Sequence, residues 1–173
     1  TTTNQKEKNI EIEIGDKFSY SQINSYNNCP YQYKLAYILK IPTKGSASFS
    51  FGQSIHNTLH KFYEKVLDLN SVKQASLFSP IIKTTNNTEI KIPSLEDLLS
   101  LYEESWINDW YENRLQRESY YKKGREILKI FYQTQEGNWS MPVSLESAFK
   151  IKVGDYFING RIDRIDQLSD GTL

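Results

Sequence analysis

The sequence predicts an α+β fold in which helices come first and a β-meander follows. From about residue 20 to residue 135, apolar side chains recur at the spacing of three and four residues that marks one face of a helix. After Pro142 the period falls to two, which is typical of a strand with one buried face. With 173 residues and 13% aromatic side chains, the chain can also bury one sizeable core.

We expect one domain rather than two, because a chain of this length seldom divides. Residues 1–17 are predicted to be a lead-in, 19–136 a helical part and 142–168 a β-hairpin. The chain does not begin with Met, and it stops just after the turn pattern Asp170-Gly171. We therefore expect it to be a segment of a larger protein.

Composition excludes several classes of protein. Basic and acidic side chains balance at 21 each, so net charge gives no indication of a nucleic-acid partner, although a local basic patch is compatible with this balance. The single cysteine, Cys29, excludes an internal disulfide framework and favours a reducing, cytoplasmic setting. No apolar run approaches the length of a membrane span, and the polar residues 1–8 do not resemble a signal peptide.

Five helices are predicted from apolar stripes and from residues that start or stop helices. Ser19 and Gln22 form a capping-box pattern before the first helix, and Pro30 fits the first position of the second. Ser94 precedes the fourth helix, and Gly137 is a stop pattern after the fifth. The predicted helices cover about 20–28, 30–39, 51–69, 95–114 and 117–135.

The remaining segments are predicted from their own patterns. Residues 10–14 alternate apolar and acidic side chains, which favours a short edge strand, whereas 70–93 is polar and irregular. Two strands, about 143–153 and 156–168, flank Gly154-Asp155, a dipeptide of the kind that closes hairpins.

The predicted hairpin places two carboxylates together. A two-residue turn at Gly154-Asp155 sets Glu146 directly opposite Asp163, with Cβ atoms about 5 Å apart. Like charges in that position destabilise a sheet unless another group neutralises them. A divalent cation would relieve the repulsion, as would Arg161 or Arg164. The alternative is a salt-bridged, solvated sheet face, on which strand charges are common.

Two histidines form a second candidate group. His56 follows Ile55 on the border of the apolar face of its predicted helix, where its side chain could enter a cleft. His60 lies one turn further on the same side, but a pair at this spacing without a Glu between them is a weak zinc pattern. A structural role is the alternative for both. Gly52, four residues before His56, suggests close backbone approach or a helix-entry turn.

Three stretches in this order, FSYSQINSYNNCPYQYKLAYILKIP, SFGQSIHNTLHKFYE and ESAFKI…GDYFINGRIDRID, give the chain a specific resemblance. Together they span residues 18–166 and resemble the RecB/AddB-type nuclease domain of the PD-(D/E)XK superfamily, in the version fused to the C-terminus of UvrD/Rep-like helicases. The resemblance implies a restriction-endonuclease-like core, incomplete here, with residues 18–173 as the N-terminal part of the domain.

The resemblance also implies roles for individual residues. His56 matches the family's metal-binding histidine, and Asp163 matches the strand aspartate that ligates the metal and serves catalysis. Glu146 matches an acidic position near the active site, and Asp166 a supporting acidic position. The family uses one or two Mg²⁺ or Mn²⁺ ions to activate water and stabilise the phosphate during phosphodiester hydrolysis.

The family's signature, Asp/Glu-x-Lys, lies on the strand after the Asp-Gly turn and supplies a second acidic ligand and a lysine. The chain ends at Leu173, before that strand, so we expect it to be inactive alone. The parent is expected to be a Mg²⁺-dependent DNA exonuclease of recombination and repair, with a helicase domain in cis or a helicase subunit in trans. The alternatives are a nuclease-dead module for DNA binding or helicase docking, and a helical interaction domain.

Two further groups take their interpretation from the resemblance. In iron–sulfur members a Cys-Pro at the position of Cys29 supplies the first ligand of a 4Fe–4S cluster, but many members keep Cys-Pro without a cluster, and one cysteine cannot hold one. Tyr31, Lys34 and Arg161 are candidates for DNA contact, because aromatic rings stack on bases and cations pair with phosphates. The alternative, favoured for most tyrosines and lysines near residue 30, is that the tyrosines lie in the core and the lysines in solvent.

Overall fold

The computed structural model describes residues 15–71 and 90–167. The chain forms two compact units, one from residues 1–43 with 148–161 and the other from 44–147 with 162–173. Helices and one three-stranded sheet make up the described part, which confirms the α+β class. The edge strand expected at 10–14 and the Asp170-Gly171 turn lie outside the described residues.

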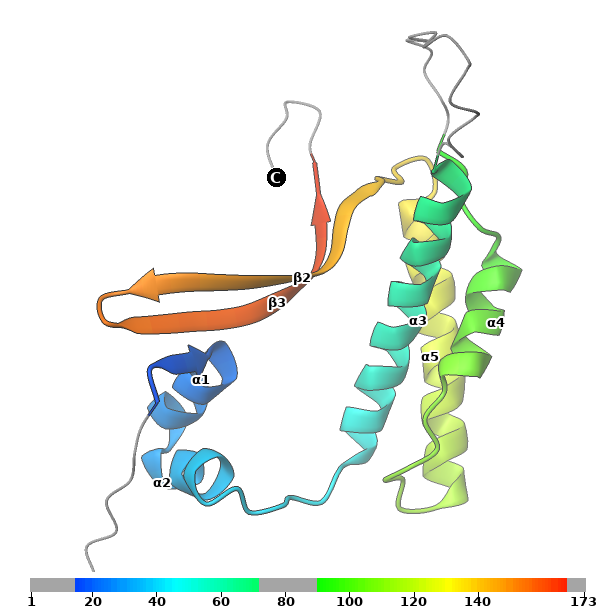
Figure 1. The fold of residues 1–173 in the computed structure, drawn as a ribbon. Helices are drawn as coiled ribbons and strands as arrows, with labels where there is room; N and C mark the ends of the chain where they lie inside the picture. Colours follow the sequence, from blue (N-terminus) through cyan, green and yellow to red (C-terminus); the bar gives the residue numbers. More distant parts are fainter. Residues whose placement is uncertain (1–14, 72–89, 168–173) are drawn as a thin grey trace, which may run out of the picture. The chain divides into compact units, whose positions relative to one another are not determined.

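The first unit begins with a strand that the sequence did not predict (Figure 1). β1 (Lys17–Ser19) pairs in parallel with Phe157–Asn159 of β3, and it is too short to display a period of two. α1 (Tyr20–Asn28) follows with the predicted bounds and capping box. The Ser19 amide donates to the Gln22 side-chain oxygen at 2.7 Å, and the Gln22 amide donates to the Ser19 hydroxyl at 3.2 Å.

The helix predicted at 30–39 is only partly confirmed. Pro30 is the first residue of α2 (Pro30–Tyr33), but the backbone then widens into the π-helical turn η1 (Lys34–Ile38). The Leu39 amide donates to the Lys34 carbonyl at 2.9 Å, five residues back, which is the π-helical pattern. Side-chain spacing alone could not distinguish this turn from the α-helix that we predicted.

A hairpin of two long strands follows the helices. β2 (Pro142–Val153) and β3 (Tyr156–Asp166) are joined by Gly154-Asp155, as predicted, and β3 lies between β1 and β2 in the sheet. Gly154 has φ of +62°, the conformation that glycine supplies at the first position of a type II′ turn. A Cβ on Gly160 would lie 2.7 Å from the Phe149 ring, so these residues face each other as the predicted register requires.

The second unit is built on three helices that lie side by side (Figure 1). The first begins earlier than predicted, because the Ser46 hydroxyl accepts a bond from the Phe49 amide at 3.2 Å and so caps it. None of the described helices is long and apolar enough to span a membrane. The three helices are α3 (Ala47–Asn70), α4 (Leu95–Ser105) and α5 (Arg114–Gln135).

The prediction of one helix over 95–114 was wrong beyond Ser105. Trp106 is extended, and Trp110 has φ of 69°, so the chain leaves the helix and turns back. The Trp106 ring stacks on Tyr111 with centroids 5.4 Å apart, and the Ile107 amide donates to the buried Ser54 hydroxyl at 3.0 Å. These tertiary contacts hold the segment as a loop although its aromatic spacing is helical.

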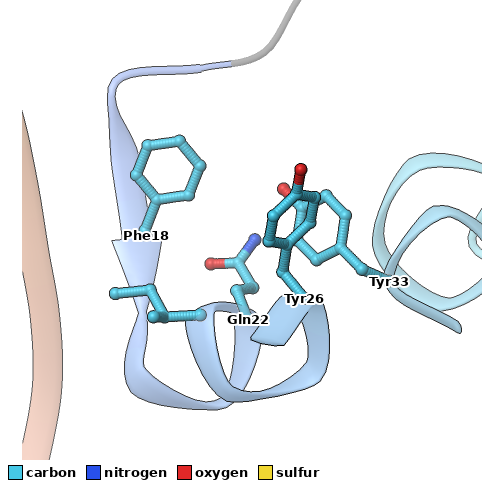
Figure 2. Close-up of a pocket in the computed structure, with 5 residues that line it drawn as sticks. Phe18, Gln22, Tyr26 and Tyr33 are labelled. Atoms are coloured by element: carbon cyan, nitrogen blue, oxygen red, sulfur yellow. The ribbon is translucent and has the colours of Figure 1, made fainter. Parts of the chain in front are cut away.

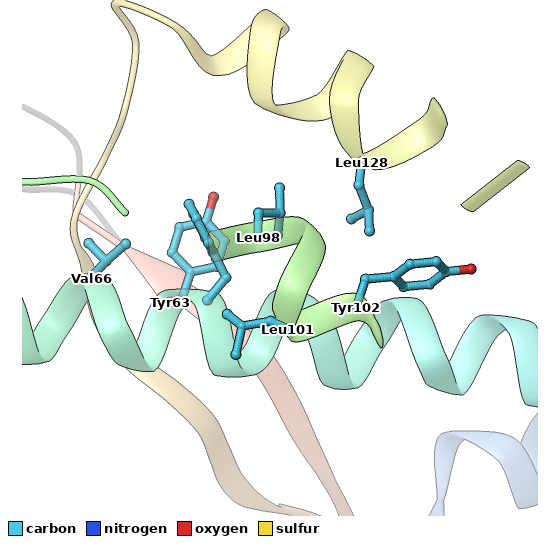
Figure 3. Packing of buried hydrophobic residues seen from close by; sticks show 7 residues of the cluster. Tyr63, Val66, Leu98, Leu101, Tyr102 and Leu128 are labelled. Atoms are coloured by element: carbon cyan, nitrogen blue, oxygen red, sulfur yellow. The ribbon is translucent and has the colours of Figure 1, made fainter. Parts of the chain in front are cut away.

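The core of the second unit lies between the three helices (Figure 3). Tyr102 of α4 is completely buried and packs against Gly124 of α5, where a Cβ would lie 2.6 Å from the Tyr102 ring. This close approach explains a glycine inside a helix, a position that otherwise lowers stability. The buried apolar residues are Phe62, Tyr63, Val66, Leu98, Leu101, Tyr102 and Leu128.

Candidate metal centre

α3 presents His56 near the middle of its 24 residues. The helix turns one face inward through the small buried residues Ser54 and Thr58, whose hydroxyls donate to carbonyls one turn back at 2.8 and 2.7 Å. His56 lies beside this face, and its side chain is 37% exposed, which agrees with the border position that the sequence predicted. A Cβ at Gly52 would meet nothing within 4 Å, which excludes close approach, and Gly52 lies inside α3, which excludes a helix-entry turn.

β2 contributes Glu146 through an irregular backbone. Glu146 has φ of +52°, a left-handed conformation that is uncommon for a residue other than glycine. Consecutive side chains of a regular strand point to opposite faces, yet Leu145 and Glu146 both line one pocket. The positive φ therefore turns the carboxylate toward the side on which Leu145 packs against the core.

β3 contributes Asp163, and the three side chains meet. The His56 Nε2 atom lies 3.0 Å from a Glu146 carboxylate oxygen, and its Nδ1 atom lies 3.7 Å from an Asp163 oxygen. One donor atom from each of the three residues lies within 4.8 Å of the others. The Glu146 side chain is 23% exposed and that of Asp163 is 73% exposed, so the cluster has an inner and an outer carboxylate.

The cluster lies in a pocket of about 210 Å³ in the second unit. An ion about 2.1 Å from each ligand needs donor atoms roughly 3–4 Å apart, so the observed spacing requires only small side-chain adjustments. Two carboxylates and one imidazole suit Mg²⁺ or Mn²⁺ better than zinc, which in structural sites prefers sulfur and several histidines. The residues present therefore fit the metal that the family resemblance implies.

His60 does not join the three donors. Its Nδ1 atom faces Glu64, four residues further along α3, at 3.5 Å. His60 still lines the same pocket as His56. The two histidines, which the sequence placed on one side of one helix, therefore have different neighbours.

Arg164 was one of two arginines that the sequence offered as a partner for Glu146 and Asp163, but it pairs with another carboxylate. Its guanidinium donates instead to both oxygens of Asp166, at 2.7 and 2.6 Å, and to the Ser140 hydroxyl at 2.6 Å. Its planar group lies over the Tyr63 ring, 3.8 Å from the centroid. Sequence analysis missed Ser140 and Tyr63, because Ser140 lies in a loop and Tyr63 occupies an ordinary apolar position of its helix.

The first unit has a different pocket, of about 350 Å³, and none of the three donors lines it (Figure 2). Its walls come from β1, α1 and α2, namely Phe18, Gln22, Ile23, Tyr26 and Tyr33. Tyr31 is 67% exposed, so the alternative of a core position, favoured for most of the nearby tyrosines, does not hold for this one. Cys29 is also exposed. The three candidates for DNA contact, Tyr31, Lys34 and Arg161, all belong to this unit.

Residues 17–173 match the sequence profile of the PD-(D/E)XK nuclease superfamily. The chain belongs to this superfamily. The match confirms the resemblance that the three ordered stretches predicted, and it makes the mixed helical and strand architecture part of a restriction-endonuclease-like fold.

The chain is also similar to one part of a longer curated protein. The chain is 24% identical over 181 residues to a subunit of the ATP-dependent helicase/deoxyribonuclease of Lactococcus lactis subsp. lactis (strain IL1403). The alignment covers 99% of this chain and 16% of that relative. No solved structure shows a significant similarity to the chain.

The backbone at Glu146 gives a first testable prediction. We expect the unfolding free energy of Glu146→Gly to be about 0.5–1 kcal/mol higher than that of Glu146→Ala. A positive φ costs alanine roughly 1–2 kcal/mol and costs glycine almost nothing. The greater freedom of glycine in the unfolded chain cancels part of this advantage. Urea denaturation of the two variants measures the difference.

The same pair of substitutions at Lys150 of β2 is the control. Lys150 is not among the residues with positive φ, so there glycine should be less stable than alanine. If the order at Glu146 matched the order at Lys150, the left-handed conformation would be refuted.

Proposed function

We propose that the chain supplies a divalent-metal centre to a DNA nuclease that hydrolyses phosphodiester bonds, as an exonuclease of recombination and repair that works with a helicase in cis or in trans. The observation that carries this proposal is the convergence of His56, Glu146 and Asp163 from three separate elements. Membership of the nuclease superfamily supports hydrolysis of nucleic acid as the general activity. We propose the cytoplasm as its compartment.

The three donors have distinct roles in this proposal. His56 would bind Mg²⁺ or Mn²⁺ through an imidazole nitrogen, and Glu146 and Asp163 through carboxylate oxygens. The bound ion would activate water and stabilise charge on the phosphate. Glu146, the more buried carboxylate, fixes the inner side of the site, whereas the exposed Asp163 faces the side from which DNA can approach.

The family resemblance implies that hydrolysis also uses a second acidic residue and a lysine. No lysine lines this pocket among the residues that the structure describes. We propose that the complete nuclease brings a further acidic residue and a lysine to the donors, and that the 173 residues alone bind the ion without cleaving DNA.

The first unit is the proposed DNA-contact surface. Its described part holds six basic residues against two acidic ones, although the chain as a whole is neutral. Lys34 and Arg161 would contact phosphates, and the exposed ring of Tyr31 would stack on a base. The six are Lys17, Lys34, Lys40, Lys150, Lys152 and Arg161, and the two are Asp16 and Asp155.

Metal titration and DNA cleavage together test the proposal. We expect the 173-residue chain to bind Mn²⁺, measured by isothermal titration calorimetry and by loss of the free-ion signal in electron paramagnetic resonance. The full-length natural polypeptide should degrade end-labelled DNA with Mg²⁺ and not with EDTA.

Two other outcomes would decide for the alternatives. If the full-length polypeptide binds DNA and Mn²⁺ but never cuts under any divalent ion, a DNA-binding or helicase-docking module replaces the nuclease. If neither the chain nor the full-length polypeptide binds Mn²⁺, the metal centre is refuted.

A further inference from the structure

We propose that Arg164 and Asp166 are positioning residues that align β3 with α3, so that Asp163 reaches the same ion as His56. This inference rests on the proposed metal centre and assigns a task to two residues beside it. It concerns the Arg164 network, which we define as Ser140, Arg164, Asp166 and the ring of Tyr63.

Arg164 is fixed by hydrogen bonds to Asp166 and Ser140. Its Nε and Nη2 atoms donate to the two oxygens of Asp166, a paired geometry that Lys cannot reproduce. Nη2 also donates to the Ser140 hydroxyl, and that hydroxyl donates to Asp166 at 3.1 Å. Ser140 precedes β2 and Arg164 lies near the end of β3, so these bonds join the two strands at the open end of the hairpin.

The same guanidinium also contacts α3. Its carbon lies 3.8 Å from the centroid of the Tyr63 ring, a cation–π contact. Tyr63 is seven residues after His56, two turns along the helix and on the same side. β3 and α3 therefore meet twice in succession, through Asp163 with His56 and through Arg164 with Tyr63.

The electrostatic interactions of Arg164 with Asp166 and Tyr63 favour a fixed position of its side chain. Burial alone would lower the pKa of Arg164, but its bonds to Asp166 and the nearby Tyr63 outweigh burial and raise that pKa. Burial raises the pKa of the Tyr63 hydroxyl, and Arg164 opposes part of this rise. The side chains of Arg164 and Asp166 are only 24% and 31% exposed, so solvent weakens their attraction less than it would at the surface.

The Arg164 network also limits competition between this guanidinium and a metal ion for the carboxylates of the site. Arg164 lines the same pocket as Glu146 and Asp163, and a free guanidinium there would pair with those carboxylates. Asp166 occupies the Nε–Nη2 edge of Arg164, and Tyr63 lies against its face. The Arg164 network therefore holds the helix and the strand in register, and it keeps this guanidinium paired with Asp166 rather than with the proposed metal ligands.

Mn²⁺ affinity of the 173-residue chain is the test, with circular dichroism to verify the fold. We expect Arg164→Lys and Asp166→Asn each to weaken Mn²⁺ binding about 10–100-fold, the range found when partners that orient metal ligands are removed. The double variant should lose about as much as either single variant, because the two residues act as one unit. The electron paramagnetic resonance spectrum of bound Mn²⁺ should also change, which general loss of stability would not cause.

Arg125→Lys is the matched control, because Arg125 pairs with Glu103 at 2.6 Å and neither residue lines the pocket of the three donors. It should leave Mn²⁺ affinity within twofold. If Asp166→Asn unfolds the chain, Tyr63→Leu takes its place, since it removes the ring and keeps an apolar side chain.

The inference fails if the wild type binds Mn²⁺ and these variants bind it equally well. It also fails if Arg164→Lys keeps Mn²⁺ affinity but weakens DNA binding by the full-length polypeptide, because Arg164 would then be a phosphate ligand. Absence of Mn²⁺ binding in the wild type would instead refute the proposed function itself.

Discussion

Asp163→Asn is expected to weaken Mn²⁺ binding more than 100-fold and to abolish DNA cleavage by the full-length polypeptide. Replacement of an outer partner of a metal ligand typically costs 10–100-fold in affinity, and loss of a charged ligand should exceed that range. Asn keeps the size of Asp163 but donates through an amide and carries no charge, so its attraction for a divalent ion falls.

The same substitution should leave the metal-free chain folded. The Asp163 side chain is 73% exposed, and exposed substitutions usually change stability by no more than about 0.5 kcal/mol. Mn²⁺ at about 100 times its dissociation constant should raise the unfolding free energy of the wild type by about 2.7 kcal/mol, and that of Asp163→Asn by far less. Thermal unfolding with and without Mn²⁺ measures both effects.

Asp68→Asn provides the comparison, because Asp68 is an exposed carboxylate near the end of α3 and is not part of the cluster. It should bind Mn²⁺ as the wild type does. Cleavage that survives in Asp163→Asn would remove this carboxylate from the active site and favour the DNA-binding alternative.

The sequence predicted those parts of the fold that depend on interactions between residues close together in the chain. The capping box at Ser19 and Gln22 fixed the start of α1, and Gly154-Asp155 fixed the turn of the hairpin. The end of α4 was missed because the Trp106 ring packs against Tyr121 of α5 and the Ile107 amide donates to Ser54 of α3, and such tertiary contacts leave no local sequence pattern. Three-residue β1 was missed because it exists only through its pairing with β3.

The sequence likewise predicted some features of the candidate site and missed others. The hairpin register predicted that Glu146 and Asp163 approach each other, and the border position of His56 predicted a side chain that can enter a cleft. Nothing in the sequence indicated the positive φ of Glu146, since backbone strain at a non-glycine residue has no side-chain pattern. The partners of Arg164 were equally hidden, because Ser140 and Tyr63 reach it from a loop and a helix.

The core of the second unit gives the largest expected effect on stability. Phe62→Ala is expected to lower the unfolding free energy by about 3–5 kcal/mol, a large part of the 5–15 kcal/mol that a domain usually has. Phe62 is completely buried on α3, and its ring contacts Tyr132 and Trp139 with centroids 6.4 and 5.6 Å away. Removal of the ring leaves a cavity between α3, α5 and the segment before β2.

Phe49 on the same helix supplies the control, because its side chain is 64% exposed. Phe49→Ala removes the same atoms from the surface and should change the unfolding free energy by no more than about 0.5 kcal/mol. Urea denaturation of both variants measures the contrast, and an equal midpoint for the two would contradict the burial of Phe62. Because Trp139 directly precedes Ser140, a loosened Phe62 contact should also disturb the Ser140 end of the Arg164 network, so Mn²⁺ affinity should fall in Phe62→Ala and not in Phe49→Ala.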